Sequence, residues 1–236
     1  MNYSWEESPF DTKILGFKTA KITYVVGNYI GDIKNDLKKQ GIVYATYRVA
    51  MDDYGMIQHL EENGFILVDG MMTLGATLAH DEQAEWEFVK EAKPENHQQV
   101  IDLSRSVFRG VTRYYHDPVI STQKADSVYE HWLKNSLNGK VADLVLVWEE
   151  GEEIFGFITL QKKGHIPLVG VSENARGKGV GKRLLLAALA RCKKWGLEEV
   201  IIETQMTNIA ALRLYHACGF KITASYLTFR WHASSI

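Results

Sequence analysis

The sequence predicts an α/β fold built on a mixed sheet, with a smaller α/β region ahead of it. Hydrophobic residues make up 46% of the 236 residues, enough for a substantial core. From residue 86 onward, several strand-like runs follow one another before strands and helices alternate, which is typical of a mixed sheet. A polar, acidic stretch at residues 80–87 separates this part from an earlier apolar-patterned region. We therefore predict an N-terminal α/β domain at residues 1–80 with a substrate or support role, and a main domain at residues 86–236.

The elements of the main domain are predicted from apolar periodicity and turn residues. After a short strand at 86–92, Pro94 opens a helix, because proline fits the first helical turn. A second helix spans residues 121–138 and ends near Gly139. Predicted to follow are strands at 144–148, 154–160 and 166–171, a helix at 179–195, a strand at 200–204, a helix at 209–218 and a strand at 226–231.

The N-terminal region contains a segment that is weakly similar in sequence to a segment of the C-terminal region. Residues 51–74 align without gaps to residues 206–229, and both segments carry a Gly-Phe pair at the same position. Because a helix followed by Gly-Phe and a strand is a common construction, two interpretations stay open. Either the likeness is a coincidence, or the chain contains a duplication whose first copy is a degenerate half-domain without chemistry.

Composition excludes several classes of protein. A formal net charge of -2 gives no reason to expect a nucleic-acid partner. Two cysteines, Cys192 and Cys218, cannot form a disulfide framework and favour reduced thiols in a cytoplasmic protein. The first ten residues lack the apolar core of a signal peptide, and no run of 18 apolar residues predicts a membrane span. Histidines and cysteines are scattered without metal-ligand spacing, so no metal site is predicted.

The most informative segment is a glycine-rich stretch between a predicted strand and helix, residues 168–183. Glycines allow a ligand to approach the backbone N–H groups closely, and a helix N-terminus adds free donors and partial positive charge. Together they predict an anion site suited to a diphosphate. Neither the P-loop nor the dinucleotide fingerprint has this spacing. The alternative is a plain tight turn.

The pattern Arg-x-x-Gly-x-Gly, formed by Arg176, Gly179 and Gly181, resembles the pyrophosphate loop of the GNAT acetyltransferases. Asn208 and Tyr215 follow two helical turns apart, as in that family. The resemblance covers the chain from residue 86 and implies the GNAT fold, acetyl-CoA as co-substrate, and direct attack by an amine. It implies that Tyr215 assists departure of the thiolate, although a core aromatic residue is the alternative. The cofactor-binding residues it implies are Val169, Val171, Arg176, Gly177, Lys178, Gly179, Val180, Gly181, Lys182 and Asn208.

A narrower likeness runs through residues 113–118, the spacing of Tyr129 and Trp132, and Phe17 near the N-terminus. These motifs resemble the dTDP-fucosamine acetyltransferases, which acetylate the amino group of a nucleotide-linked sugar. The resemblance therefore implies a small-molecule amine substrate, a dTDP-amino sugar, and a homodimer. Acetylation of another amine (a peptide N-terminus, polyamine or antibiotic) and a non-catalytic acetyl-CoA-binding module remain alternatives.

An amine is mostly protonated at neutral pH, so the reaction needs a base or a water relay. Asp69 is the leading candidate because it interrupts an apolar run, where burial would raise its pKa. Asp11 and Glu203 are further candidates, and a solvated surface acid is the alternative for each. A phenol has a pKa of about 10 and a thiol about 8.5, so full proton transfer from Tyr215 is uphill by roughly 2 kcal/mol. Either the site lowers the tyrosine's pKa, or the hydroxyl mainly donates a hydrogen bond.

Overall fold

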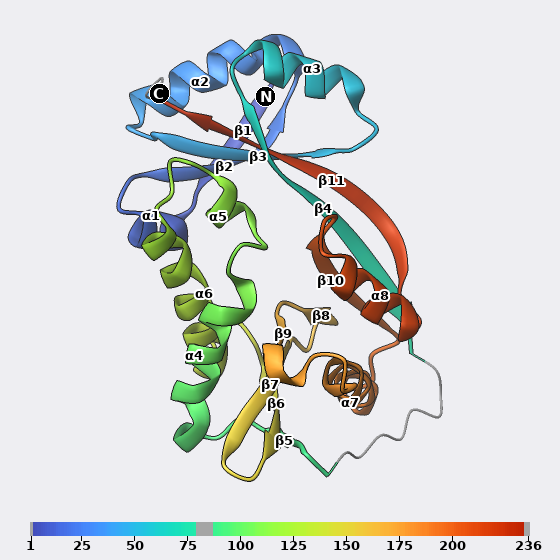
Figure 1. Ribbon diagram of the computed structural model, residues 1–236. Coiled ribbons are helices and arrows are strands. Elements are labelled where there is room, and N and C mark those ends of the chain that lie inside the picture. Colours follow the sequence, from blue (N-terminus) through green and yellow to red (C-terminus); the bar gives the residue numbers. More distant parts are fainter. Residues whose placement is uncertain (1, 79–86, 234–236) are drawn as a thin grey trace. The chain divides into compact units, whose positions relative to one another are not determined.

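A computed structural model describes residues 2–78 and 87–233 (Figure 1). They form two compact units that are interleaved along the chain. The first unit comprises Met1–Met71, Arg113–Lys124 and Ala224–Ile236, and the second comprises Met72–Thr112 and Ala125–Thr223. Most of the predicted boundary, residues 80–86, lies outside the described residues. The long strands β4 (Ile66–Thr77) and β11 (Lys221–His232) contribute residues to both units.

The first unit is a sheet with helices packed on it (Figure 1). Its strands follow the order β1-β2-β3-β11, with only the β2–β3 pair parallel. Apolar side chains such as Ile33 and Leu60 form its core with Phe229 of β11. Its other elements are β1 (Tyr3–Glu7), α1 (Pro9–Leu15), β2 (Thr19–Val25), α2 (Ile30–Lys39), β3 (Tyr44–Ala50), α3 (Tyr54–Glu62) and α5 (Arg113–His116).

The second unit contains an antiparallel sheet of order β5-β6-β7-β9, together with strands β4, β10 and β8 of the other sheet. Leu184 of α7 packs with Ile158 on one face of β7, and Phe157 on the other face meets Phe108 of α4 with ring centroids 6.2 Å apart. The elements are β5 (Val89–Glu91), α4 (His97–Phe108), α6 (Thr122–Leu137), β6 (Leu144–Glu150), β7 (Glu153–Leu160), β8 (His165–Ile166), β9 (Val169–Val171), α7 (Val180–Lys194), β10 (Glu199–Gln205) and α8 (Ile209–Ala217).

The predicted α/β fold with a mixed sheet is confirmed, but the single strand at residues 166–171 is wrong. Pro167 and Leu168 divide it into β8 and β9. Proline has no N–H to donate to a ladder, so pairing stops there. Strand β8 pairs with β10 in parallel, whereas β9 pairs with β7 in antiparallel fashion. The chain therefore passes from one sheet to the other within two residues.

The internal similarity between the two segments extends to the bounds of three consecutive secondary-structure elements. A shift of 155 residues carries Tyr54, the start of α3, onto Ile209, the start of α8. The same shift superposes the full bounds of β3 on β10, of α3 on α8 and of β4 on β11. The helix caps match as well, because Asp53 and Asn208 each accept a hydrogen bond from the backbone N–H three residues later. This agreement favours duplication over coincidence.

The first copy lacks the features to which the sequence assigns chemistry in the second. Its strand β2 is continuous and pairs with β3 from Thr19 to Ile22, so no division corresponds to Pro167. Its helix has Leu60 where α8 has Tyr215. The copies also exchange final strands: β3 lies beside β11 of the second copy, and β10 beside β4 of the first.

Candidate active site

Strand β9 presents a free edge. It is the last strand of its sheet, so its second side is not paired with a strand in the part of the chain that the structure describes. The hydrogen bonds from Thr159 N–H to Leu168 O (2.9 Å) and from Ser172 N–H to Phe155 O (2.8 Å) fix which residues face β7. Because bonding alternates along an antiparallel ladder, the N–H and C=O groups of Val169 and Val171 point to the free side.

The glycine-rich loop continues from this edge to the start of α7 (Figure 1). Gly177 and Gly179 have φ angles of 75° and 81°, which favour glycine. Arg183 N–H donates to Gly179 O (3.1 Å) as the first helical bond, and no side chain caps the helix. The N–H groups of residues 180–182 are therefore available to a ligand.

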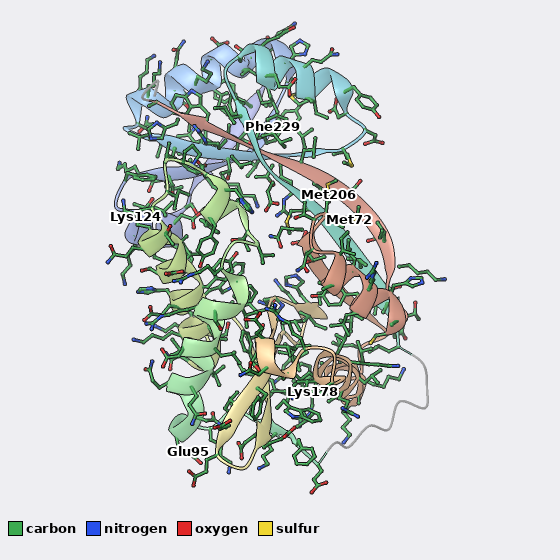
Figure 2. All side chains as sticks on the ribbon, viewed as in Figure 1. Met72, Glu95, Lys124, Lys178, Met206 and Phe229 are labelled. Atoms are coloured by element: carbon green, nitrogen blue, oxygen red, sulfur yellow. The ribbon has the colours of Figure 1, made fainter. Side chains whose placement is uncertain are left out.

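The cationic side chains of this loop divide into two groups. Arg176, Lys178 and Lys182 are exposed, and Figure 2 labels Lys178 beside the start of α7. Arg183 instead turns back, because its Nη1 donates to Lys178 O (2.9 Å) and its guanidinium lies 5.6 Å from the centre of the Trp148 ring. Arg183 thus braces the loop, while the exposed cations surround the free N–H groups with positive charge.

Close packing joins the loop to β9 and α8. A Cβ atom on Gly181 would lie 3.1 Å from Leu214 Cδ2 and 3.4 Å from Val171 Cγ2. Gly181 therefore lets the first turn of α7 approach both elements, and this places the free N–H groups beside the free edge of β9.

Tyr215 is buried at the end of α8, with 5% of its surface exposed. Its ring meets Phe220 at a centroid distance of 6.0 Å. Burial raises the pKa of its phenol. The surroundings of the phenol therefore do not lower its pKa, which favours hydrogen-bond donation over full proton transfer as its predicted role.

Asn208, which is predicted to contact coenzyme A, also has a structural role. It precedes α8 as its N-cap instead of lying within the helix, and its Oδ1 accepts from Ala211 N–H (3.2 Å). Its Nδ2 donates to Thr204 Oγ1 (3.2 Å). One amide hydrogen remains for a ligand, so its contact with coenzyme A stays a prediction.

The three candidate bases lie in different surroundings. Asp69 is half-buried on β4 within the first unit. Asp11 accepts a hydrogen bond from Tyr114 (3.0 Å) and pairs with Arg113 (3.7 Å), contacts that indicate a structural role. Glu203 is half-buried on β10 and accepts a hydrogen bond from Thr73 (3.1 Å).

Sequence reasoning missed two residues near Glu203. Thr73 lies 130 residues away along the chain, and His165 lies on β8, whose pairing with β10 brings it to the same sheet. Neither belongs to a local motif, so only the register of the strands reveals them.

The fold, with a free strand edge beside a glycine-rich helix start, agrees with the predicted acyl-CoA N-acyltransferase fold. Residues 105–220 match the acetyltransferase (GNAT) family. The chain therefore contains a GNAT-family domain and is an acetyl-CoA-dependent N-acetyltransferase. Among the described residues, no helix is long and apolar enough to cross a membrane.

Similar proteins include both long and short matches. The spore coat polysaccharide biosynthesis protein SpsD of Bacillus subtilis is 23% identical over 94% of this chain and 80% of its own. A mycothiol acetyltransferase of Thermobispora bispora is 42% identical, but over 24% of this chain and 19% of its own length. The crystal structure of a GCN5-related N-acetyltransferase from Sphaerobacter thermophilus matches with a TM-score of 0.66 at 17% identity, over 99% of this chain and 78% of that one. That structural likeness supports the fold alone.

Proposed function

We propose that the protein transfers the acetyl group of acetyl-CoA to the amino group of a nucleotide-linked amino sugar. The observation that carries the transfer reaction is the free edge of β9, which leads directly to the exposed N–H groups at the start of α7. A pantetheine arm is an amide chain that can pair with such an edge, and a diphosphate suits the helix start. The residues present therefore fit coenzyme A.

In this proposal the diphosphate is held by Arg176 and Lys178, by Lys182, and by the backbone from Gly177 to Gly181. The outward-facing groups of Val169 and Val171 pair with the pantetheine, and an N–H of this edge stabilises the oxyanion that develops on the thioester. The amine attacks the carbonyl carbon directly. Tyr215 donates a hydrogen bond to the departing sulfur.

The choice of a sugar rests on two supports. One is the likeness to SpsD over nearly the whole chain, a protein named for polysaccharide biosynthesis. The other is the first unit, which supplies more protein than a minimal acetyltransferase domain needs. A second candidate, acetylation of another amine, is favoured by the short but more identical match to a mycothiol acetyltransferase. A homodimer and a cytoplasmic location also belong to this proposal.

The test measures thiol release from acetyl-CoA with dTDP-4-amino-4,6-dideoxygalactose, a polyamine and a short peptide. Release with the nucleotide sugar alone supports the proposal, and release with another amine alone retains the transferase and discards the sugar. Acetyl-CoA binding without any release points to a binding module. Tyr215→Phe should lower kcat by about 10²–10³-fold, the range for removing one hydrogen-bond donor that stabilises developing charge. A change below about threefold contradicts the role of Tyr215.

A further inference from the structure

His165 lies on the face of the sheet that is turned away from α7. It pairs with Ile201 in the parallel ladder of β8 and β10. The next pair of that ladder, Ile166 with Ile202, is buried in the core to which α7 contributes. Because side chains alternate along a strand, His165 and Ile201 share the opposite face. Ile201 is 45% exposed, so a ligand can reach this face without displacing the core.

The backbone at His165 is held on both sides. Gln161 N–H donates to His165 O (2.9 Å), and Ile201 N–H donates to Gly164 O (2.7 Å). A Cβ atom on Gly164 would lie 2.7 Å from Glu199 O, so glycine is needed for β8 to approach β10 this closely. The position of the His165 backbone is therefore fixed by strand pairing and close packing.

Strand β8 leads directly into β9, the strand that is proposed to pair with the pantetheine (Figure 1). Only Pro167 and Leu168 separate the two strands. The ladder between β8 and β10 ends there, because β9 pairs with β7 of the other sheet instead. His165 is thus close along the chain to the proposed site of acetyl transfer.

The hydrogen bonds around the His165 ring fix which of its nitrogens carries the proton. Gln161 donates through Nε2 to Val141 O, which turns Gln161 Oε1 toward the histidine. His165 Nδ1 lies 3.3 Å from that oxygen and is therefore the donor. The other ring nitrogen, Nε2, keeps a lone pair, and no group in the described part of the chain donates a hydrogen bond to it.

The charge of the His165 ring follows from its surroundings. Burial lowers its pKa, while the carboxylate of Glu203 raises it and the ammonium of Lys163 lowers it. Burial is the largest of these effects, so the ring is neutral at pH 7. A neutral Nε2 accepts hydrogen bonds and does not donate them. Because the lowered pKa also makes the ring a weak base, accepting a hydrogen bond suits it better than removing a proton.

Ile201 places an apolar side chain beside this hydrogen-bond acceptor. Neighbouring strands lie about 4.8 Å apart, a spacing that suits two substituents on either side of one carbon of a pyranose ring. A 4-amino-4,6-dideoxy sugar carries such a pair around its amine-bearing carbon. A hydroxyl stands on one side and a methyl group on the other.

The first copy has a different pair at the matching register. There Lys21 of β2 pairs with Thr46 of β3. The shift of 155 residues carries Thr46 onto Ile201, so Lys21 and Thr46 stand where the second copy has His165 and Ile201. A lysine ammonium donates hydrogen bonds but cannot accept them. The acceptor with its apolar neighbour therefore occurs in the copy that also contains the glycine-rich loop.

From these observations we infer that His165 and Ile201 select the acceptor sugar. His165 Nε2 accepts a hydrogen bond from the hydroxyl next to the reacting amine, and Ile201 contacts the methyl group of the 6-deoxy sugar. These roles rest on the proposed acetyl transfer to a nucleotide-linked amino sugar. Both residues determine specificity, and neither takes up a proton in the reaction.

The test of His165 compares kcat/KM for dTDP-4-amino-4,6-dideoxygalactose and for its 3-deoxy analogue, which lacks the hydroxyl next to the amine. The wild type should prefer the hydroxylated acceptor by about five- to tenfold, the range for one neutral hydrogen bond. His165→Phe keeps a ring but no acceptor, so the two acceptors should react about equally. His165→Gln, whose side-chain oxygen can accept, should retain part of the preference. A ratio of two acceptors is unaffected by a loss of folded protein, since both rates fall alike.

The matched control is His59→Phe. His59 is also half-buried, and its Nδ1 likewise lies at hydrogen-bond distance from an oxygen, Gly55 O (2.7 Å). This variant should keep the wild-type ratio. For Ile201, the comparison is with dTDP-4-amino-4-deoxygalactose, which carries a hydroxyl at carbon 6. Ile201→Ala should lower the preference for the 6-deoxy acceptor by about fourfold, as expected for the contact of one methyl group.

Equal rates for the two acceptors in the wild type, or an unchanged ratio in His165→Phe, overturn the role of His165. An unchanged preference for the 6-deoxy acceptor in Ile201→Ala overturns that of Ile201. In each case the wild type still acetylates the nucleotide sugar, so the proposed function stands. If the wild type releases thiol with none of these sugars, the proposed sugar substrate fails and both roles fail with it.

Discussion

Replacing Asp117 by asparagine should destabilise the first unit severely. Asp117 Oδ1 lies 3.1 Å from Arg230 Nε, and the two side chains are 0% and 5% exposed. Tyr44 donates to the other carboxylate oxygen (2.9 Å). Asparagine is nearly isosteric and keeps an acceptor, but it leaves the guanidinium buried without its counter-charge. Removing one partner of a buried pair costs about 3–5 kcal/mol.

The assay is urea unfolding followed by circular dichroism. At about 2–4 °C per kcal/mol for a chain of this size, a loss of about 3 kcal/mol also lowers Tm by roughly 6–12 °C. Arg230→Met should cost a similar amount, while the double variant should cost clearly less than the sum, because neither charge remains. The control Asp102→Asn, in an exposed pair with Arg105, should leave the urea midpoint unchanged. A loss below about 1 kcal/mol in Asp117→Asn, or strict additivity in the double variant, refutes the reasoning.

Three further predictions concern the second unit. Gly156→Ala places a Cβ 2.9 Å from Leu184 Cδ1, so it should push α7 away and lower the free energy of unfolding by about 1–3 kcal/mol. It should also weaken acetyl-CoA binding measured by calorimetry. The control Gly31→Ala, which has open space around its Cβ, should do neither. Burial raises the pKa of Tyr215, so ultraviolet titration should show its phenol still protonated above pH 10. In that range the folded state keeps a proton that the unfolded state releases. The contribution of Tyr215 to the free energy of unfolding should therefore fall as the pH rises above about 10. Burial raises the pKa of the Cys192 thiol to about 11, so Ellman's reagent at pH 8 should spare it in the native protein and detect two thiols in urea.

Local sequence patterns predicted much of the fold. The helix expected at residues 121–138 is α6, and the helix expected at 179–195 is α7, because periodicity and terminal glycines act within a few residues. The apolar run at residues 166–171 does not reveal the division of β8 from β9, which arises because Pro167 has no N–H to donate to the ladder. Glycine spacing led to the loop before α7 because that motif is contiguous.

The rest depends on contacts between distant residues. Thr73 meets Glu203 through strand order, and strand order is not encoded in the pattern of either strand alone. Likewise, the ungapped alignment of the two copies indicates matching elements, but it does not show that the copies exchange their final strands. A strand's alternation shows which face is buried, but not which neighbour it pairs with.

The exchange of final strands has a consequence for how the protein folds during its synthesis. Ala50 of β3 pairs with Tyr226 of β11, so the sheet of the first unit lacks a strand until β11 has left the ribosome. Contacts so far apart along the chain make folding slow, because a long loop must close first. Until β11 is made, the N-terminal segment should therefore keep an unpaired strand edge that is prone to aggregation. For the same reason, fragments cut between the two copies should fold together but not separately.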